Sequence, residues 1–177
     1  ATGSMTLALR MKVYNYDRER ALIEWYGTES GLHLWTGVWG WQWGGLGTGA
    51  NLIDTAGNDT HIVATANPSP GQWHHLAVTY DYASGYGKVF VDGVVKSTIL
   101  LGKFTPATAS DVYIGSRPSQ PFDRFCGLLD DIRIYDEALS DGEIASLSLS
   151  TTNGEPVVGA LTCTIIPAIA VAAGAQW

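Results

Sequence analysis

The chain has 177 residues, of which 46% are hydrophobic and 15% charged, enough for one domain with a sizeable core and too apolar for a disordered chain. Seventeen acidic against ten basic residues give a net charge of −7. Because an acidic surface repels phosphate backbones, we expect no nucleic-acid partner. The 21 glycines, eight tyrosines and seven tryptophans favour a β-rich fold with many turns.

Alternating apolar and polar runs, separated by turn residues, follow one another along the chain. No basic, apolar leader opens the sequence, so we expect that any signal peptide has been removed or never existed. The alternation predicts strands at 5–14, 21–27, 31–35, 38–44, 73–81, 88–99, 110–116 and 126–136, with a hairpin joining 31–35 to 38–44 and turns at 57–58 and 82–87. Asp92-Gly93 is typical of a type I′ hairpin turn.

One helical signal interrupts the strands. Ser140 with Glu143 three residues later forms a capping box, and Ile144 and Leu147 follow at helical spacing. Many short strands with one short helix predict an antiparallel sandwich.

Four segments, in order, carry a family resemblance: "GQWHHLAVTYD" (71–81), "VFVDGVV" (89–95), "VYIGS" (112–116) and "FCGLLDDIRIYDEALSDGEI" (125–144). Together they resemble the laminin-G-like, concanavalin A-like domains of large secreted bacterial proteins. The resemblance implies an all-β jelly-roll sandwich of two antiparallel sheets with one short helical turn over residues 1–150. It also implies an extracellular or cell-surface role in glycan binding or adhesion. Two departures stand out: only four residues precede "MTLALRM", and an apolar extension occupies 151–177.

Catalytic signals are weak. Retaining glycosidases need two carboxylates about 5–5.5 Å apart. Glu24 has no acidic neighbour at two or four residues along its predicted strand, and Glu29 lies across a predicted turn. No nucleophile elbow or sialidase-type Asp box is present. We therefore expect no enzyme, although the fold includes glycoside hydrolases and lyases.

Two segments bear on metal binding. His74 and His75 are adjacent in a predicted strand, so their side chains point to opposite faces and cannot hold one ion together. Leu129 and Ile132 lie at odd and even positions, so a regular strand would point them to opposite sides. If both face the core, the strand must contain a bulge at Asp130-Asp131. Asp130 there either fixes the bend through backbone N–H groups or is a ligand of calcium, which related domains often hold at the rim.

Aromatic residues supply the candidate ligand contacts. Trp39, Trp41 and Trp43 share one parity, and the opposite parity is small and polar, so the row is predicted to face the core, with a sugar platform as the alternative. Trp43, nearest the following turn, is the candidate at the rim. Tyr82 and Tyr86 flank a turn and suit either a sugar or a protein contact.

The extension has no charged residue from Pro156 to Ala175 and alternates large with small apolar side chains, which is typical of a strand with one buried face. It either pairs within its own domain or reaches a neighbouring subunit, which predicts self-association through residues 156–173. A membrane span is opposed by Pro167 near its centre and by the absence of flanking Lys or Arg. Cys126 and Cys163 lack zinc-type spacing and form a disulfide only if the fold brings them together.

The sequence thus predicts a non-catalytic binding or adhesion domain for glycans or a cell-surface matrix. The alternative is a structural subunit that polymerises through its terminal strands. The sequence does not identify the ligand.

Overall fold

The computed structural model describes residues 3–28, 30–39, 45, 47–118, 120, 122–149 and 170–171, with the backbone alone at 30, 170 and 171. Its elements are β1 (Met5–Val13), β2 (Arg20–Tyr26), β3 (Ser30–Thr36), β4 (Thr48–Asn51), β5 (Ile62–Thr65), β6 (His74–Asp81), β7 (Tyr86–Val91), β8 (Val94–Leu100), β9 (Asp111–Ile114), β10 (Gly127–Tyr135), α1 (Asp141–Leu149) and β11 (Ala170–Val171).

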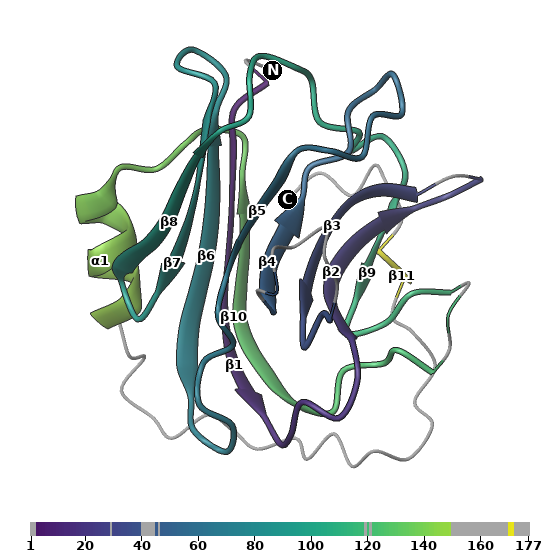
Figure 1. Ribbon diagram of the computed structural model, residues 1–177, viewed down its shortest axis with the longest axis vertical. Coiled ribbons are helices and arrows are strands. Elements are labelled where there is room, and N and C mark those ends of the chain that lie inside the picture. The colour runs from purple at the N-terminus through teal and green to yellow at the C-terminus, as the bar shows by residue number, and fades with distance from the viewer. Residues whose placement is uncertain are drawn as a thin grey trace.

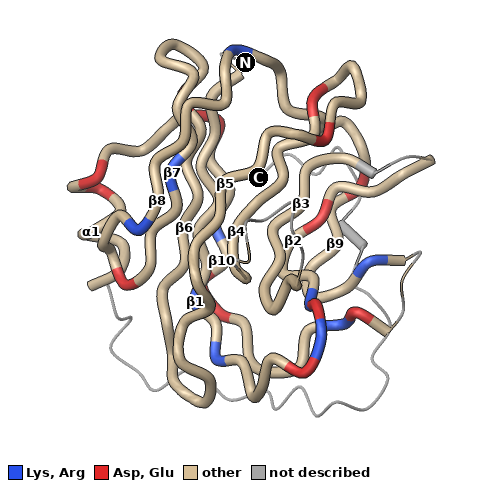
Figure 2. Tube along the Cα trace, viewed as in Figure 1, with Lys and Arg blue, Asp and Glu red and all other residues tan. Residues whose placement is uncertain are grey.

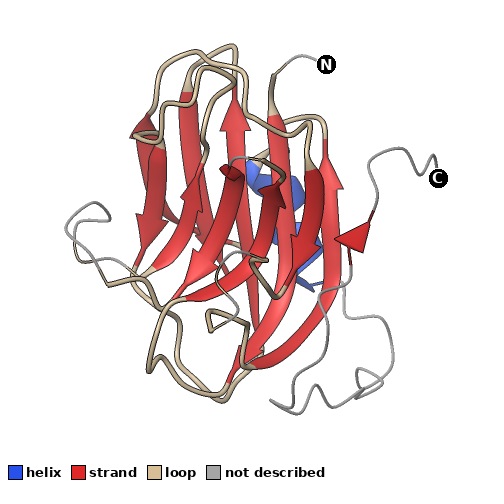
Figure 3. Cartoon of the chain, turned by 90° about the vertical axis from the view of Figure 1, so that its right-hand side faces the viewer, coloured by secondary structure: helices blue, strands red, loops and turns tan. Residues whose placement is uncertain are grey.

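Two antiparallel sheets face each other (Figure 1). One has five strands in the order β10-β1-β6-β7-β8, and the other has six in the order β11-β9-β2-β3-β4-β5. The predicted two-sheet, jelly-roll sandwich with one short helix is confirmed. Helix α1 lies against the outer side of the five-stranded sheet (Figure 1). In Figure 3 the outer side of the six-stranded sheet faces the viewer, and α1 lies behind both sheets.

The main core lies between the sheets. Alternate residues of β1 and β6 supply it from one sheet, and β2, β3 and β4 supply it from the other, with Leu7, Leu9, Leu32, Leu34, Leu52, Leu76 and Tyr80 fully buried. Each such side chain contributes roughly 1.5–3 kcal/mol by leaving water, so this layer is the main stabilising feature of the domain.

The predicted capping box forms. The Ser140 hydroxyl accepts the Glu143 N–H at 3.3 Å, and the Glu143 carboxylate accepts the Ser140 N–H at 2.7 Å. The helix that follows buries Ile144 against Ala8 and Phe90 on the outer side of the five-stranded sheet. The capping pair therefore begins α1 where its apolar side meets the sheet.

The predicted bulge in β10 is also present. Between the pairs Ala8↔Arg133 and Arg10↔Asp130, β1 has one residue and β10 has two. Asp131 adopts a φ of 49°, and its N–H donates to the Asp130 carboxylate at 2.8 Å. Asp130 therefore fixes the bend, and the extra residue lets both Leu129 and Ile132 face the core.

The tryptophan segment differs from the prediction. Strand β3 ends at Thr36, and the next residue, Gly37, has a φ of +70° and lies against the Arg18 carbonyl, a left-handed conformation that interrupts the alternation of the strand. The strand that pairs with β3 is β4, and Trp39 is 73% exposed in the connecting loop. Its predicted place in an inward row is wrong, while Trp41 and Trp43 lie outside the described residues.

Part of the C-terminal extension joins the fold. Ala170 and Val171 pair antiparallel with Tyr113 and Val112 of β9, at the edge of the six-stranded sheet. The rest of the extension lies outside the described residues, so the predicted strand there and its contact with another subunit stay predictions. Cys126 is disulfide-bonded, and the other cysteine of the chain, Cys163, is outside the described residues.

Candidate functional site: the outer side of the six-stranded sheet

A bulge in β2 places a carboxylate on the outer side of the six-stranded sheet. Ala21 pairs with Trp35 and Ile23 pairs with Leu34, so Leu22 is an extra residue in β2. Leu22 and Ile23 consequently both face the core, and Glu24 returns to the outer side beside Ala21. Figure 2 shows that the strands of this sheet are largely uncharged.

Strand register builds a row of polar side chains across this outer side. Tyr113 of β9 is paired with Glu24, Glu24 with His33, and His33 with Asn51 of β4. Paired residues point to the same face of a sheet, so the four side chains are neighbours there. A second row holds Trp35, which packs with Ala21, Ala64 and other small or aliphatic residues.

Glu24 is fully buried and paired. One carboxylate oxygen accepts the indole N–H of Trp35 at 3.0 Å, and the other accepts the Nε–H of Arg117, whose guanidinium carbon also lies 4.8 Å from the centre of the Trp35 ring. Arg117 additionally donates to Gln120 at 2.9 Å. Burial raises the pKa of Glu24, and the Arg117 charge opposes that shift. Both carboxylate oxygens are engaged, so this arrangement is that of an anchored ion pair.

Two buried polar atoms beside this pair have no hydrogen-bond partner among the described residues: Nδ1 of His33 and Oδ1 of Asn51. The His33 ring packs edge-on against Trp35, with ring centres 5.8 Å apart. Burial, and then the charge of Arg117, lowers the pKa of His33 to about 4, so the imidazole is neutral at physiological pH. A buried polar group left unsatisfied costs about 1–3 kcal/mol.

Two exposed aromatic residues lie in loops next to this sheet. Phe122 is 78% exposed and directly precedes Asp123, whose carbonyl accepts the Ala21 N–H at 3.0 Å. Trp39, 73% exposed, directly follows Val38, which packs with Ala21 and Trp35. Two loops that are far apart in the sequence therefore bring exposed aromatic residues to the same end of the six-stranded sheet.

The predicted tyrosines lie elsewhere. Tyr82 and Tyr86 follow β6, on the other sheet, and each lines a different groove. Tyr82 borders a cavity of about 770 Å³ with Trp25, Tyr135 and Thr105. Tyr86 borders one of about 700 Å³ beside α1. The predicted ligand residue Trp43 lies outside the described residues.

The metal candidates do not come together. In the described part of the chain, no group of three or more His, Cys, Asp or Glu side chains could hold a metal ion. Asp130 uses its carboxylate on the neighbouring backbone, and His74 contacts Asp92 at 2.8 Å while His75 is buried on the opposite face. The calcium site stays a prediction.

The family follows from comparison with known proteins. Residues 1–145 match the Concanavalin A-like lectin/glucanases superfamily. The chain belongs to this family. A search of the curated proteins found no match.

Several solved structures share the fold. A SAP-like pentraxin from Limulus polyphemus is 15% identical, with a TM-score of 0.66 over 97% of this chain and 81% of its own. The carbohydrate-binding module of a Ruminococcus gnavus sialidase, bound to α2,3-sialyllactose, is 20% identical, with a TM-score of 0.66 over 84% of this chain and 83% of its own. Domain 4 of an extracellular arabinanase from Geobacillus stearothermophilus, in complex with arabinotriose, is 21% identical, with a TM-score of 0.59 over 84% and 68%.

Sequence reasoning missed the site on the six-stranded sheet. The sequence shows only that Glu24 has no acidic residue nearby, whereas the partner of Glu24 in the fold, Arg117, is 93 positions away.

No described helix is long and apolar enough to cross a bilayer.

Proposed function

We propose that this protein is a non-catalytic carbohydrate-binding domain that acts outside the cell or at its surface, with the outer side of the six-stranded sheet as its binding surface. Its family, and neighbours whose structures hold sialyllactose and arabinotriose, support a glycan ligand. A binding role rather than catalysis is supported by Glu24, whose two carboxylate oxygens are held by Trp35 and Arg117.

One observation carries the location. Trp39 and Phe122, two of the most exposed aromatic side chains described, belong to loops that meet the same end of the six-stranded sheet. An aromatic ring packs on the C–H face of a pyranose, and polar groups near such a ring hydrogen-bond the hydroxyls of the sugar. Exposed apolar rings are unfavourable in water, and packing against a sugar removes that exposure.

The test is affinity electrophoresis of the full chain in gels that contain arabinan, xylan, galactomannan or β-glucan. Trp39→Ala and Phe122→Ala should each weaken binding about tenfold, which corresponds to about 1.4 kcal/mol per ring. Trp39→Phe should keep most of the affinity because it keeps a ring. Leu100→Ala is the matched control, since Leu100 is 64% exposed on β8 of the other sheet. Unchanged retardation of both alanine variants would refute this location.

A second candidate, a structural subunit, is favoured by the pairing of Ala170–Val171 with β9. A terminal segment that completes a sheet edge can be exchanged between copies, as in domain swapping. Light scattering of the full chain and of a chain ending at residue 150 tests this. Large particles that disappear on truncation would support it, whereas equal particle sizes would overturn it.

A further inference from the structure

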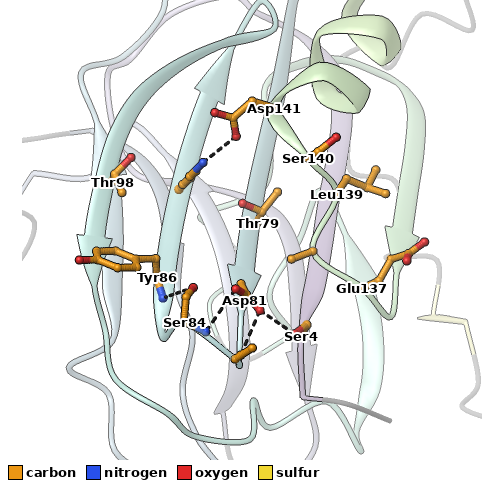
Figure 4. A pocket seen from close by; sticks show the side chains of 13 residues that line it. Ser4, Thr79, Asp81, Ser84, Tyr86, Thr98, Glu137, Leu139, Ser140 and Asp141 are labelled. Atoms are coloured by element: carbon orange, nitrogen blue, oxygen red, sulfur yellow. Dashed lines mark hydrogen bonds and ion pairs between the residues drawn. The ribbon is translucent and has the colours of Figure 1, made fainter.

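Helix α1 leaves part of the outer side of the five-stranded sheet uncovered. The helix packs on Ala8, Ala77 and Phe90, and the sheet continues beyond it as the row Thr79↔Lys88↔Thr98 across β6, β7 and β8. This portion, the N-terminal segment and residues 137–141 enclose the groove of about 700 Å³ shown in Figure 4. We call it the helix-side groove.

The helix-side groove presents one aromatic ring and several hydroxyl groups. Tyr86 is 43% exposed on one wall, with Thr98 near it; Thr79 lies on the floor, and Leu139 and Ser140 lie opposite (Figure 4). An aromatic ring with convergent hydroxyl donors and acceptors is typical of a site for a polyhydroxylated ligand.

A carboxylate in the groove is fixed as an acceptor. Asp81 accepts the N–H groups of Ala83 at 3.0 Å and Ser84 at 3.2 Å, and the Ser4 hydroxyl at 3.5 Å. These hydrogen bonds hold the pKa of Asp81 below its usual value. Because these donors belong to the fold itself, the carboxylate is ionised and oriented before any ligand arrives.

The charge of the groove selects against acidic ligands. Asp81, Glu137 and Asp141 line it against a single cation, Lys88, so the balance is three negative charges to one positive. Lys88 already pairs with Asp141 at 2.7 Å. A uronate, sialate or sulfate would meet a net negative lining with no free cation among the lining residues.

We propose that the helix-side groove is a second carbohydrate site and that it takes neutral oligosaccharides. It lies on the opposite sheet from Trp39 and Phe122, and beside Ser4 at the other end of the strands. The two sites cannot share one sugar unit, so a single domain engages two segments or two chains of a polysaccharide. Sugar binding in the helix-side groove does not depend on whether Trp39 and Phe122 bind a sugar.

The experiment uses the full chain in gels with the same neutral polysaccharides and, separately, with polygalacturonate. Tyr86→Ala should raise the dissociation constant for at least one neutral polysaccharide about five- to tenfold, and Tyr86→Phe should stay within about twofold because the ring remains. Thr98→Arg, which fills the groove from β8, should reproduce the loss without removing Tyr86. The gel that contains polygalacturonate should not retard the protein, because the helix-side groove is negatively charged.

The two proposals are separated by combining variants. Additive losses for Trp39→Ala and Tyr86→Ala, with nearly complete loss in the double variant, support two sites. Wild-type retardation of both Tyr86→Ala and Thr98→Arg in every neutral gel overturns the helix-side groove and leaves the first site standing. Loss in the groove variants with none in Trp39→Ala or Phe122→Ala supports the groove and refutes the location given under the proposed function.

Discussion

Removing the charge of Arg117 should expose how the fold tolerates Glu24. The Glu24 side chain is 0% and the Arg117 side chain 14% exposed, so the pair is shielded from water. Arg117→Met keeps most of the aliphatic stem over Trp35 but leaves a buried carboxylate without its cation. Losing one partner of a buried pair costs about 3–5 kcal/mol, mostly because the remaining charge is uncompensated.

The double variant Glu24→Gln/Arg117→Met is the matched control. It removes both charges, and the amide oxygen of the substituted side chain can still accept the Trp35 indole N–H that Glu24 accepts. Replacing a whole buried pair by neutral groups is often nearly neutral. We therefore expect the double variant to lie within about 1 kcal/mol of the wild type in the free energy of unfolding.

The pH dependence has a definite sign. Burial already raises the pKa of Glu24 above its unfolded value, and loss of Arg117 removes the charge that opposes this shift. The cost of the buried carboxylate is present above the folded-state pKa and is relieved as the pH falls through it, because the folded state then binds a proton. The deficit of Arg117→Met should therefore shrink as the pH is lowered from neutrality toward the ordinary range of glutamate.

Urea unfolding followed by tryptophan fluorescence at neutral and mildly acidic pH measures both effects. A loss below about 1 kcal/mol for Arg117→Met at neutral pH would refute the reasoning, as would a deficit that does not change with pH. An equal loss in the double variant would show that packing, and not the uncompensated charge, is the cause.

Three further changes test other parts of the fold. Ser140→Ala removes the capping hydroxyl of α1 and should cost about 1 kcal/mol in urea unfolding, with Ser140→Asp retaining most of the stability. Asp54→Ala should lower the melting temperature at neutral pH, because hydrogen bonds from Asn58 and Ala56 hold the pKa of Asp54 at about 2. The difference in melting temperature between the wild type and this variant should narrow as the pH falls from 3.8 to about 2. For calcium at Asp130, EDTA should lower the melting temperature and added Ca²⁺ should restore it, and no shift in a metal-stripped sample would end that prediction.

The sequence predicted features whose cause is local. The Asp92-Gly93 turn forms with φ values of 53° and 76°, since these two residue types tolerate the left-handed region that a type I′ turn requires. The cap of α1 forms because its donor and acceptor are three residues apart. The β10 bulge can be predicted because an inserted residue shifts the apolar positions of a strand with one buried side from odd to even numbers.

The tryptophan segment shows where parity fails. The alternation in "VWGWQWG" predicts inward rings only if a regular strand runs through it, and β3 ends at Thr36, just before the left-handed Gly37. The decisive contact is the Arg18 carbonyl, which lies where a Cβ on Gly37 would be and belongs to a loop that precedes β2. The alternation of residues along a segment contains no information about such a contact, so the exposed Trp39 is predicted to face the core.

Charge links the two proposed sites in a way that neither shows alone. On the six-stranded sheet, the cation Arg117 is already bound by Glu24, and His33 is neutral at physiological pH because its pKa is lowered to about 4. In the helix-side groove, the cation Lys88 is already bound by Asp141. Since the chain also carries a net charge of −7, an acidic glycan would meet long-range repulsion and would have to break an ion pair at either site. Neutral polysaccharides meet neither cost, and binding to them should accordingly change little with ionic strength, whereas strong binding to an acidic polysaccharide would contradict both site assignments.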